Sequence, residues 1–186
     1  MTRLWLIRHG PTHARGMIGW TDRPADLSDA PALARLEATL PAGAPVVSSD
    51  LVRAAATADA IQAGRPRLPH DPDLREFNYG DWEDRPADAI DEAELRAFLE
   101  RPGRVRAPNG ESWDDVAARV HAAMARHATG PDLIVVAHMG VILTLWARAR
   151  GVAPYAALAQ RIAPLSLTRI DWTDGALTPG YANRLA

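Results

Sequence analysis

Three short apolar runs limit most strongly what this chain can fold into. They cover residues 4–7, 45–49 and 133–137. The first and the last are apolar at every position, which is typical of strands buried on both faces of a parallel sheet. A polar residue follows each run, and a helical pattern begins after it. Strands that alternate with helices in this way predict an α/β domain with a mostly parallel sheet.

Helical patterns fill the intervals between these runs. They are expected at residues 31–40, 51–63, 87–99, 113–127 and 140–149. Asp50 is expected to cap the second helix and Ser112 the fourth, because their side-chain oxygens can accept hydrogen bonds from a first helical turn. Two strands, at 166–172 and 176–178, with a turn at 173–175, are expected to form a hairpin. The expected architecture is one domain over residues 1–186, with three layers, α/β/α, around a mostly parallel central sheet.

Composition excludes several classes of function. Hydrophobic residues make up 47% of the 186 residues and the net charge is −2, so the chain has no basic field to hold a nucleic acid. All 21 basic side chains are arginine, and cysteine does not occur. This excludes a Schiff-base lysine, a Walker-type lysine, disulfides and cysteine-bound zinc. The most apolar stretch, 133–147, is shorter than the roughly 20 residues of a membrane span. We expect a cytoplasmic protein without nucleic-acid or membrane partners.

Charged and imidazole side chains follow the ends of the three predicted strands. Arg8 and His9 come after the first, Arg53 lies one turn into the helix after the second, and His138 follows the third. The carboxyl ends of parallel strands meet at one edge of a sheet, where such folds bind ligands. Two helix N-termini at the same edge attract anions. The pattern therefore predicts a phosphate pocket.

Five sequence motifs occur in one order along the chain. They are L-I-R-H-G-P-T at 6–12, S-S-D-L-V-R-A followed by T-A at 48–58, L-R-E-F with G-D-W-E at 74–83, P-N-G-E-S at 108–112 and V-V-A-H-M-G at 135–140. This ordered set resembles the signatures of the histidine phosphatase superfamily, the phosphoglycerate-mutase-like proteins. The motifs look most like those of its alpha-ribazole phosphatase and broad-specificity phosphatase branch. The resemblance implies a phosphoglycerate-mutase-like fold.

The resemblance also implies a mechanism with three catalytic residues. His9 is the expected nucleophile, and it must be neutral to attack phosphorus. A cationic His138, with Arg8 and Arg53, is expected to hold the phosphoryl oxygens and to lower the pKa of His9. Glu76 is the expected general acid and then the base for water, with a raised pKa. No cofactor is expected. No metal is expected either, because no third ligand accompanies the pair of His9 and His13.

Two further residues are expected to bind phosphate, namely Thr12 and Arg15. The family commonly has asparagine where this chain has Arg15. An arginine there can turn outward to solvent, or lie along the cleft and pair with an anionic group of the substrate or with Asp22. We expect the second arrangement, because the segment runs along the rim of a site that attracts anions. Pro11 after R-H-G and Asp84 after W-E also depart from the family pattern, as does the missing glycine in residues 24–30.

The predicted activity is metal-independent hydrolysis of a small phosphate ester, with alpha-ribazole phosphate as one candidate. A phosphoglycerate mutase is the second hypothesis. It is disfavoured because only 61 residues separate Glu76 from His138 and because a hairpin, rather than a closing tail, follows Ile170. A phosphohistidine-protein phosphatase and a catalytically silent binding module are two further hypotheses. The oligomeric state is not predicted.

Overall fold

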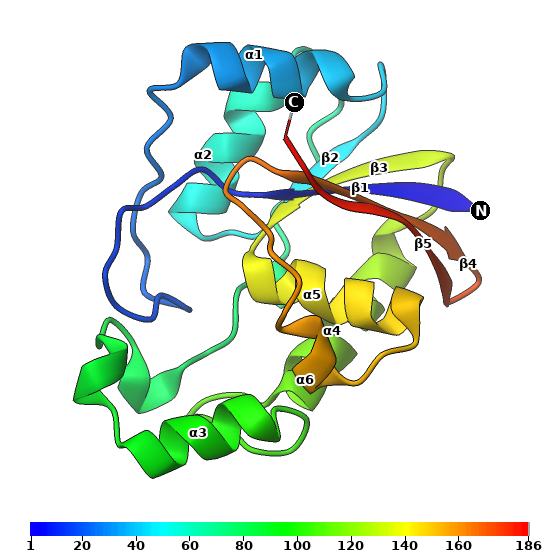
Figure 1. Cartoon of the computed structure of the whole chain (residues 1–186). Helices are drawn as coiled ribbons and strands as arrows, with labels where there is room; N and C mark the ends of the chain where they lie inside the picture. The colour runs from blue at the N-terminus through cyan, green and yellow to red at the C-terminus, as the bar shows by residue number, and fades with distance from the viewer. Residues whose placement is uncertain (186) are drawn as a thin grey trace.

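A mixed sheet of five strands organises the described part of the chain (Figure 1). The computed structural model describes residues 1–185. The strand order is β2-β3-β1-β4-β5, with β1 (Thr2–Arg8), β2 (Val46–Ser48), β3 (Asp132–Ala137), β4 (Leu167–Thr173) and β5 (Ala176–Arg184). The β2-β3-β1 half is parallel, as the sequence predicts, and β4 and β5 extend it in antiparallel pairing.

Helices cover both faces of the sheet and complete the expected three layers (Figure 1). On one face lie α1 (Ala30–Thr39) and α2 (Val52–Ile61), and on the other lie α4 (Trp113–His127) and α5 (Met139–Arg150). Side chains of a strand point alternately to its two faces. Leu4 and Leu6 accordingly pack in the core that contains α4 and α5, and Ile7 packs in the core that contains α1 and α2.

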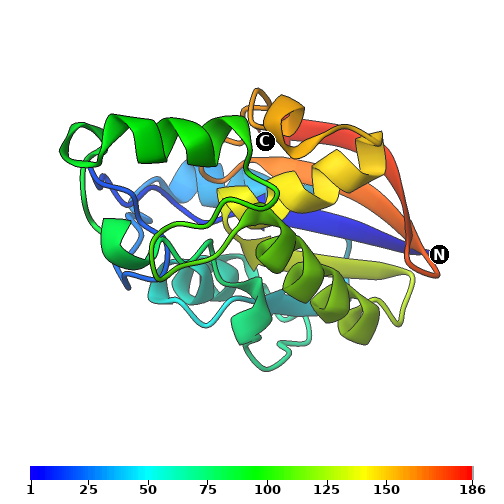
Figure 2. The ribbon, with the colours of Figure 1, turned by 90° about the horizontal axis from the view of Figure 1, so that it is seen from below.

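The chain between α2 and α4 is less regular. Residues 66–68 run beside β2, and the later part lies near the carboxyl edge of β1. It contains the short 3-10 helices η1 (Pro72–Leu74), η2 (Gly80–Trp82) and η3 (Ala87–Ala89) and the helix α3 (Glu92–Glu100). Figures 1 and 2 show α3 displaced from the sheet toward the edge at which β1 ends. A last short helix, α6 (Pro154–Ala157), follows α5.

Two expectations about helix starts are wrong. The helix expected at 87–99 is divided, because the Asp91 side chain accepts hydrogen bonds from Ala93 N and Glu94 N and starts α3 there. Asp50 does not cap α2. Its carboxylate is bound by Arg75 through two hydrogen bonds of 2.8 and 2.5 Å, so it is committed to an ion pair.

The predicted cap at Ser112 is confirmed. Its side chain accepts from Asp115 N, and the Asp115 carboxylate accepts from Ser112 N in return, which makes a capping box.

Among residues 1–185, none of the helices combines the length and apolar character needed to cross a membrane.

Candidate active site

A cavity of about 390 Å³ opens beside the ends of β1 and β3. Its polar lining comes from Arg8, His9, Thr12, Arg53 and Glu76. The structure therefore brings together residues from three separate motifs of the sequence. The rest of the wall is mainly apolar, and includes Met17, Ile18, Phe77, Tyr79, Phe98, Leu99, Trp113, Met139, Leu143 and Leu158.

His9 and His138 lie side by side at the centre of this edge. Each directly follows one of two paired parallel strands, in which Arg8 is the partner of Ala137. His9 N donates to the carbonyl oxygen of Ala137 at 3.0 Å, which continues the pairing by one residue. The two rings are 5.1 Å apart between centroids, and both residues are buried.

The protonation of His9 follows from its surroundings. Its Nδ1 lies 2.6 Å from the carbonyl oxygen of Gly10. A carbonyl oxygen can only accept, so Nδ1 carries the proton and Nε2 carries the lone pair. Burial is the largest cause that lowers the pKa of His9; the Gly10 carbonyl opposes it, Arg53 and Arg8 add to it, and the net result is a pKa of about 3. The ring is neutral at neutral pH, as expected, although desolvation contributes more than the arginines.

The predicted cationic state of His138 is not the state of the free site. Burial, the neighbouring His9 and nearby arginines including Arg53 hold the pKa of His138 well below its usual range. A buried imidazole among cationic neighbours is most stable in its neutral form. Within residues 1–185, neither ring nitrogen of His138 has a hydrogen-bond partner.

The two arginines keep part of their hydrogen-bonding capacity for the cavity. Arg8 Nη1 donates to Ile162 O at 2.6 Å, while its buried Nε has no partner in the described chain. Arg53 is 1% exposed and donates to Gly19 O and Thr21 O at 2.5 and 2.9 Å. Burial lowers the pKa of both arginines, yet arginine remains charged in proteins. The site is therefore cationic with free donors, which suits an anion.

Glu76 lies at the N-terminus of α5, next to the histidines. Its two carboxylate oxygens accept from Gly140 N at 3.1 Å each, and Oε1 accepts from Phe77 N at 3.0 Å. Burial raises the pKa of Glu76, against the opposing effects of these hydrogen bonds and of Arg53 and Arg8. The direction agrees with the expectation for a general acid.

Thr12 lines the cavity, but Arg15 does not. Thr12, Ala14 and Gly16 face the cavity, whereas His13 and Arg15 between them are exposed. The chain turns here, because His13 has a φ of +55° and residues 15–16 form a bend. Arg15 is exposed and does not line the cavity, so the structure does not place it along the cleft as expected. Asp22, its proposed partner, accepts from Val52 N instead.

Glu83 contributes to the site in a way that the motifs alone do not reveal. Its carboxylate accepts from the backbone N–H groups of Gly19, Trp20, Thr21 and Tyr79 at 2.7–3.1 Å, and from Thr21 Oγ1 at 2.6 Å. These bonds join the loop after β1 to the segment that carries Glu76. The only signal in the sequence is the W-E pair at 82–83, which indicates membership of a motif but not this structural role.

The departure at Asp84 has a backbone explanation. Its φ is +59°, in the left-handed region that glycine adopts most easily and that aspartate tolerates better than most residues. Its carboxylate pairs with Arg23 at 2.5 Å.

Among residues 1–185 no group of three or more His, Asp or Glu side chains is placed to hold a metal ion. Metal independence stays a prediction.

A neutral buried imidazole beside cationic donors is an arrangement that suits the transfer of a phosphoryl group through histidine. The profile of the histidine phosphatase superfamily (branch 1) matches residues 4–183. The chain belongs to this superfamily.

Individual relatives share the whole fold. The "Probable phosphoglycerate mutase GpmB" of Proteus mirabilis is 30% identical over 195 residues, covering 98% of this chain and 89% of that protein. Bacillus stearothermophilus YhfR is 28% identical with a TM-score of 0.87, over 100% of this chain and 98% of that one. The alpha-ribazole phosphatase from Shigella flexneri is 26% identical with a TM-score of 0.82, over the same shares. The phosphoglycerate-mutase-like fold is confirmed, and the family supports the predicted enzyme with phosphatase activity.

Proposed function

We propose that this chain hydrolyses a small organic phosphate monoester through a phosphohistidine formed on His9. The observation that carries the proposal is the 2.6 Å contact between His9 Nδ1 and the Gly10 carbonyl oxygen. It leaves Nε2 unprotonated, and burial keeps the ring neutral. These are the two conditions for attack of an imidazole on phosphorus.

The phosphoryl group would be bound by donors that are free for it. Arg8 Nε and the ring nitrogens of His138 have no partner in the described chain. Arg8, His9 and Arg53 line the cavity, and the His138 ring lies 5.1 Å from that of His9. Cationic donors would hold the oxygens and stabilise the charge that moves during transfer. A bound dianion would also raise the pKa of the His138 ring and so favour its cationic form.

The reaction has two steps. His9 Nε2 attacks phosphorus, the ester P–O bond breaks, and the Glu76 carboxyl group gives its proton to the departing alkoxide. Water then attacks the phosphohistidine, the P–N bond breaks, and the Glu76 carboxylate accepts the proton from that water. The raised pKa of Glu76, caused by burial, favours the protonated form that the first step needs.

The cavity wall supports an ester whose alcohol has apolar or aromatic surface. Phe77, Tyr79, Phe98 and Trp113 line it, whereas Arg15 is turned to solvent. A second anionic group on the substrate would gain nothing from Arg15. Alpha-ribazole phosphate, which the name of the Shigella flexneri relative indicates, is one candidate. The chain has no cysteine, which suits a reducing compartment, and we propose a cytoplasmic substrate.

The competing hypotheses have less support. His9 is only 6% exposed, which disfavours attack on a phosphorylated side chain of a partner protein. The buried nitrogens that have no partner in the described chain, Arg8 Nε and those of the His138 ring, would be costly in a silent binding module. Phosphoglycerate mutation is the activity in the name of the Proteus mirabilis relative, and it enters the test below.

The test is a panel of phosphate esters ranked by kcat/KM, with and without EDTA. We expect hydrolysis that EDTA leaves unchanged, with aromatic or apolar esters ahead of phosphoglycerates. Interconversion of 2- and 3-phosphoglycerate that is faster than phosphate release would replace the phosphatase with a mutase. Activity that EDTA removes would contradict the metal-free mechanism.

A further inference from the structure

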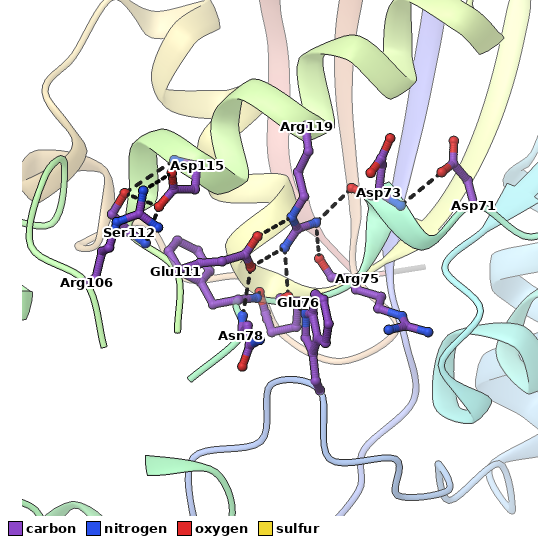
Figure 3. A network of polar contacts seen from close by, with 12 residues as sticks. Asp71, Asp73, Arg75, Glu76, Asn78, Arg106, Glu111, Ser112, Asp115 and Arg119 are labelled. Atoms are coloured by element: carbon purple, nitrogen blue, oxygen red, sulfur yellow. Dashed lines mark hydrogen bonds and ion pairs between the residues drawn. The ribbon is translucent and has the colours of Figure 1, made fainter. Parts of the chain in front are cut away.

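Arg119 of α4 points toward the segment that carries Glu76 (Figure 3). Its Nη1 donates to the carbonyl oxygens of Asp73 and Arg75 at 2.8 and 2.7 Å, and its Nη2 donates to the carbonyl oxygen of Glu76 at 2.8 Å. One guanidinium thus binds three backbone carbonyls within four residues.

Glu111 completes the arrangement from the other side (Figure 3). Its carboxylate accepts from Arg119 Nε at 2.8 Å and from Arg119 Nη2 at 2.9 Å. The same carboxylate accepts from Asn78 N at 2.9 Å, and Glu111 N donates to Asn78 O at 2.8 Å. Residues on both sides of Glu76 are therefore tied to one ion pair, whose side chains are only 14% and 17% exposed.

The segment needs such an anchor because it has no regular structure of its own. Residues 75–79 lie between η1 and η2, outside any helix or strand. Apart from Arg119, the Glu76 carbonyl accepts from Trp20 Nε1 at 2.9 Å. A proton donor must lie within hydrogen-bond reach of the leaving oxygen, and an error of about 1 Å can cost roughly 100-fold in rate.

We propose that Arg119 and Glu111 act together as positioning residues for Glu76. Neither side chain lines the cavity, so they act by fixing where the Glu76 carboxyl group lies. The charge of Arg119 also lowers the pKa of His138, but that effect applies to every ester alike. The inference rests on the proposed function, in which Glu76 donates the proton to the leaving group.

The test compares Arg119→Met and Glu111→Gln on two esters. One is a simple alkyl phosphate, whose alkoxide must be protonated, and the other is p-nitrophenyl phosphate, whose leaving group needs no proton. We expect kcat/KM for the alkyl ester to fall by roughly 10- to 100-fold in both variants. For p-nitrophenyl phosphate we expect a fall of less than about threefold, since positioning of the acid is not needed there.

The pH profile separates positioning from a simple charge effect. A Glu76 carboxyl group that is held less firmly is better hydrated, so its pKa falls toward the ordinary value and the basic limb of kcat/KM moves to lower pH. We expect this movement in both variants. Through charge alone, loss of Arg119 would raise the pKa of Glu76 and loss of Glu111 would lower it. Opposite movements, or none, would overturn the proposal.

Arg126 supplies a matched control. It lies on the same helix and forms ion pairs with the carboxylates of Asp71 and Asp73 at 2.9 and 2.7 Å, without binding the carbonyls around Glu76. Arg126→Met should keep the wild-type ratio between the two esters and the wild-type pH profile. If Arg119→Met fails to fold, Glu111→Gln and Arg119→Lys carry the test, because both retain most of the buried volume.

Failure of the positioning role and failure of the proposed function give different results. Equal losses on both esters in Arg119→Met and Glu111→Gln would overturn the positioning role while leaving the phosphatase in place. A wild-type protein that hydrolyses neither ester, or a Glu76→Gln variant that loses both equally, would instead count against the proposed function itself.

Discussion

The carbonyl oxygen of Gly10 lies 2.6 Å from Nδ1 of His9, the residue directly before it. This contact sets which ring nitrogen of His9 is protonated. Gly10 is itself anchored, because its N–H donates to Thr57 Oγ1 at 3.0 Å. Thr57 in turn donates to the carbonyl oxygen of Arg53 at 2.7 Å. The buried hydroxyl of Thr57 therefore links the backbone of the loop that follows His9 to the backbone of Arg53.

Replacement of Thr57 tests this link. Thr57→Val keeps the shape of the side chain but leaves Gly10 N–H buried without an acceptor, which costs about 1–3 kcal/mol. We expect a lower free energy of unfolding and a reduced kcat/KM. Thr144→Val is the control, because the Thr144 hydroxyl is also buried and donates to Val141 O at 2.8 Å. The control should lose some stability and keep its activity, and equal activity in both variants would contradict the link.

Glu76→Gln tests the general acid. Glutamine retains the size of the side chain but cannot give up a proton, so kcat/KM for alkyl phosphates should fall by about 10²–10⁴-fold. The loss with p-nitrophenyl phosphate should be far smaller. Steady-state kinetics on both esters measure the difference. Parallel losses would remove Glu76 from this role.

Gly140→Ala tests the close approach between α5 and the acid. A Cβ at Gly140 would lie 2.3 Å from Glu76 Oε1 and 2.4 Å from Phe77 Cδ2, so the carboxyl group must move. We expect kcat/KM for alkyl esters to fall by roughly 100-fold. Gly130→Ala is the matched control, since a Cβ there meets nothing within 4 Å. An active Gly140→Ala enzyme would show that the acid tolerates displacement.

The stability of the fold should depend on His9 below neutral pH. Burial lowers the pKa of His9 to about 3 in the folded chain from 6.5, so the unfolded chain binds the proton first as the pH falls. The stabilisation is present above about pH 6.5 and is lost toward the folded pKa. Between pH 7 and pH 5 the wild type should lose about 2 kcal/mol more than His9→Gln. Urea unfolding of both proteins at both pH values measures the free energies of unfolding. Equal losses between pH 7 and pH 5 in the wild type and His9→Gln would contradict a neutral buried ring.

Much of the fold could be predicted because its signals are local. Each apolar run became a strand, and Ser112 formed the predicted capping box. Asp50 failed as a cap because Arg75, 25 residues away, binds its carboxylate. The preference of aspartate for the first position of a helix depends only on the neighbouring residues. It therefore could not predict that Arg75 would bind the Asp50 carboxylate.

The candidate site, like the fold, could be predicted only where local signals determine it. The ends of paired strands had to bring His9 and His138 together, because parallel pairing fixes their register. The direction of Arg15 depends on the turn at His13, where φ is +55°, and the order of residues in an irregular segment does not reveal such a turn. Likewise, the neutral state of His138 follows from complete burial, and burial at that level is a property of the assembled fold.

The most direct test is to trap the phosphorylated enzyme. Wild-type protein mixed with a ³²P-labelled ester and quenched within milliseconds should carry label that is lost in acid and stable in base, as a phosphohistidine is. Peptide mapping should place the label on His9, and His9→Ala should carry none and lose its activity. Label on a His9→Ala protein, or full activity in that variant, would contradict the mechanism.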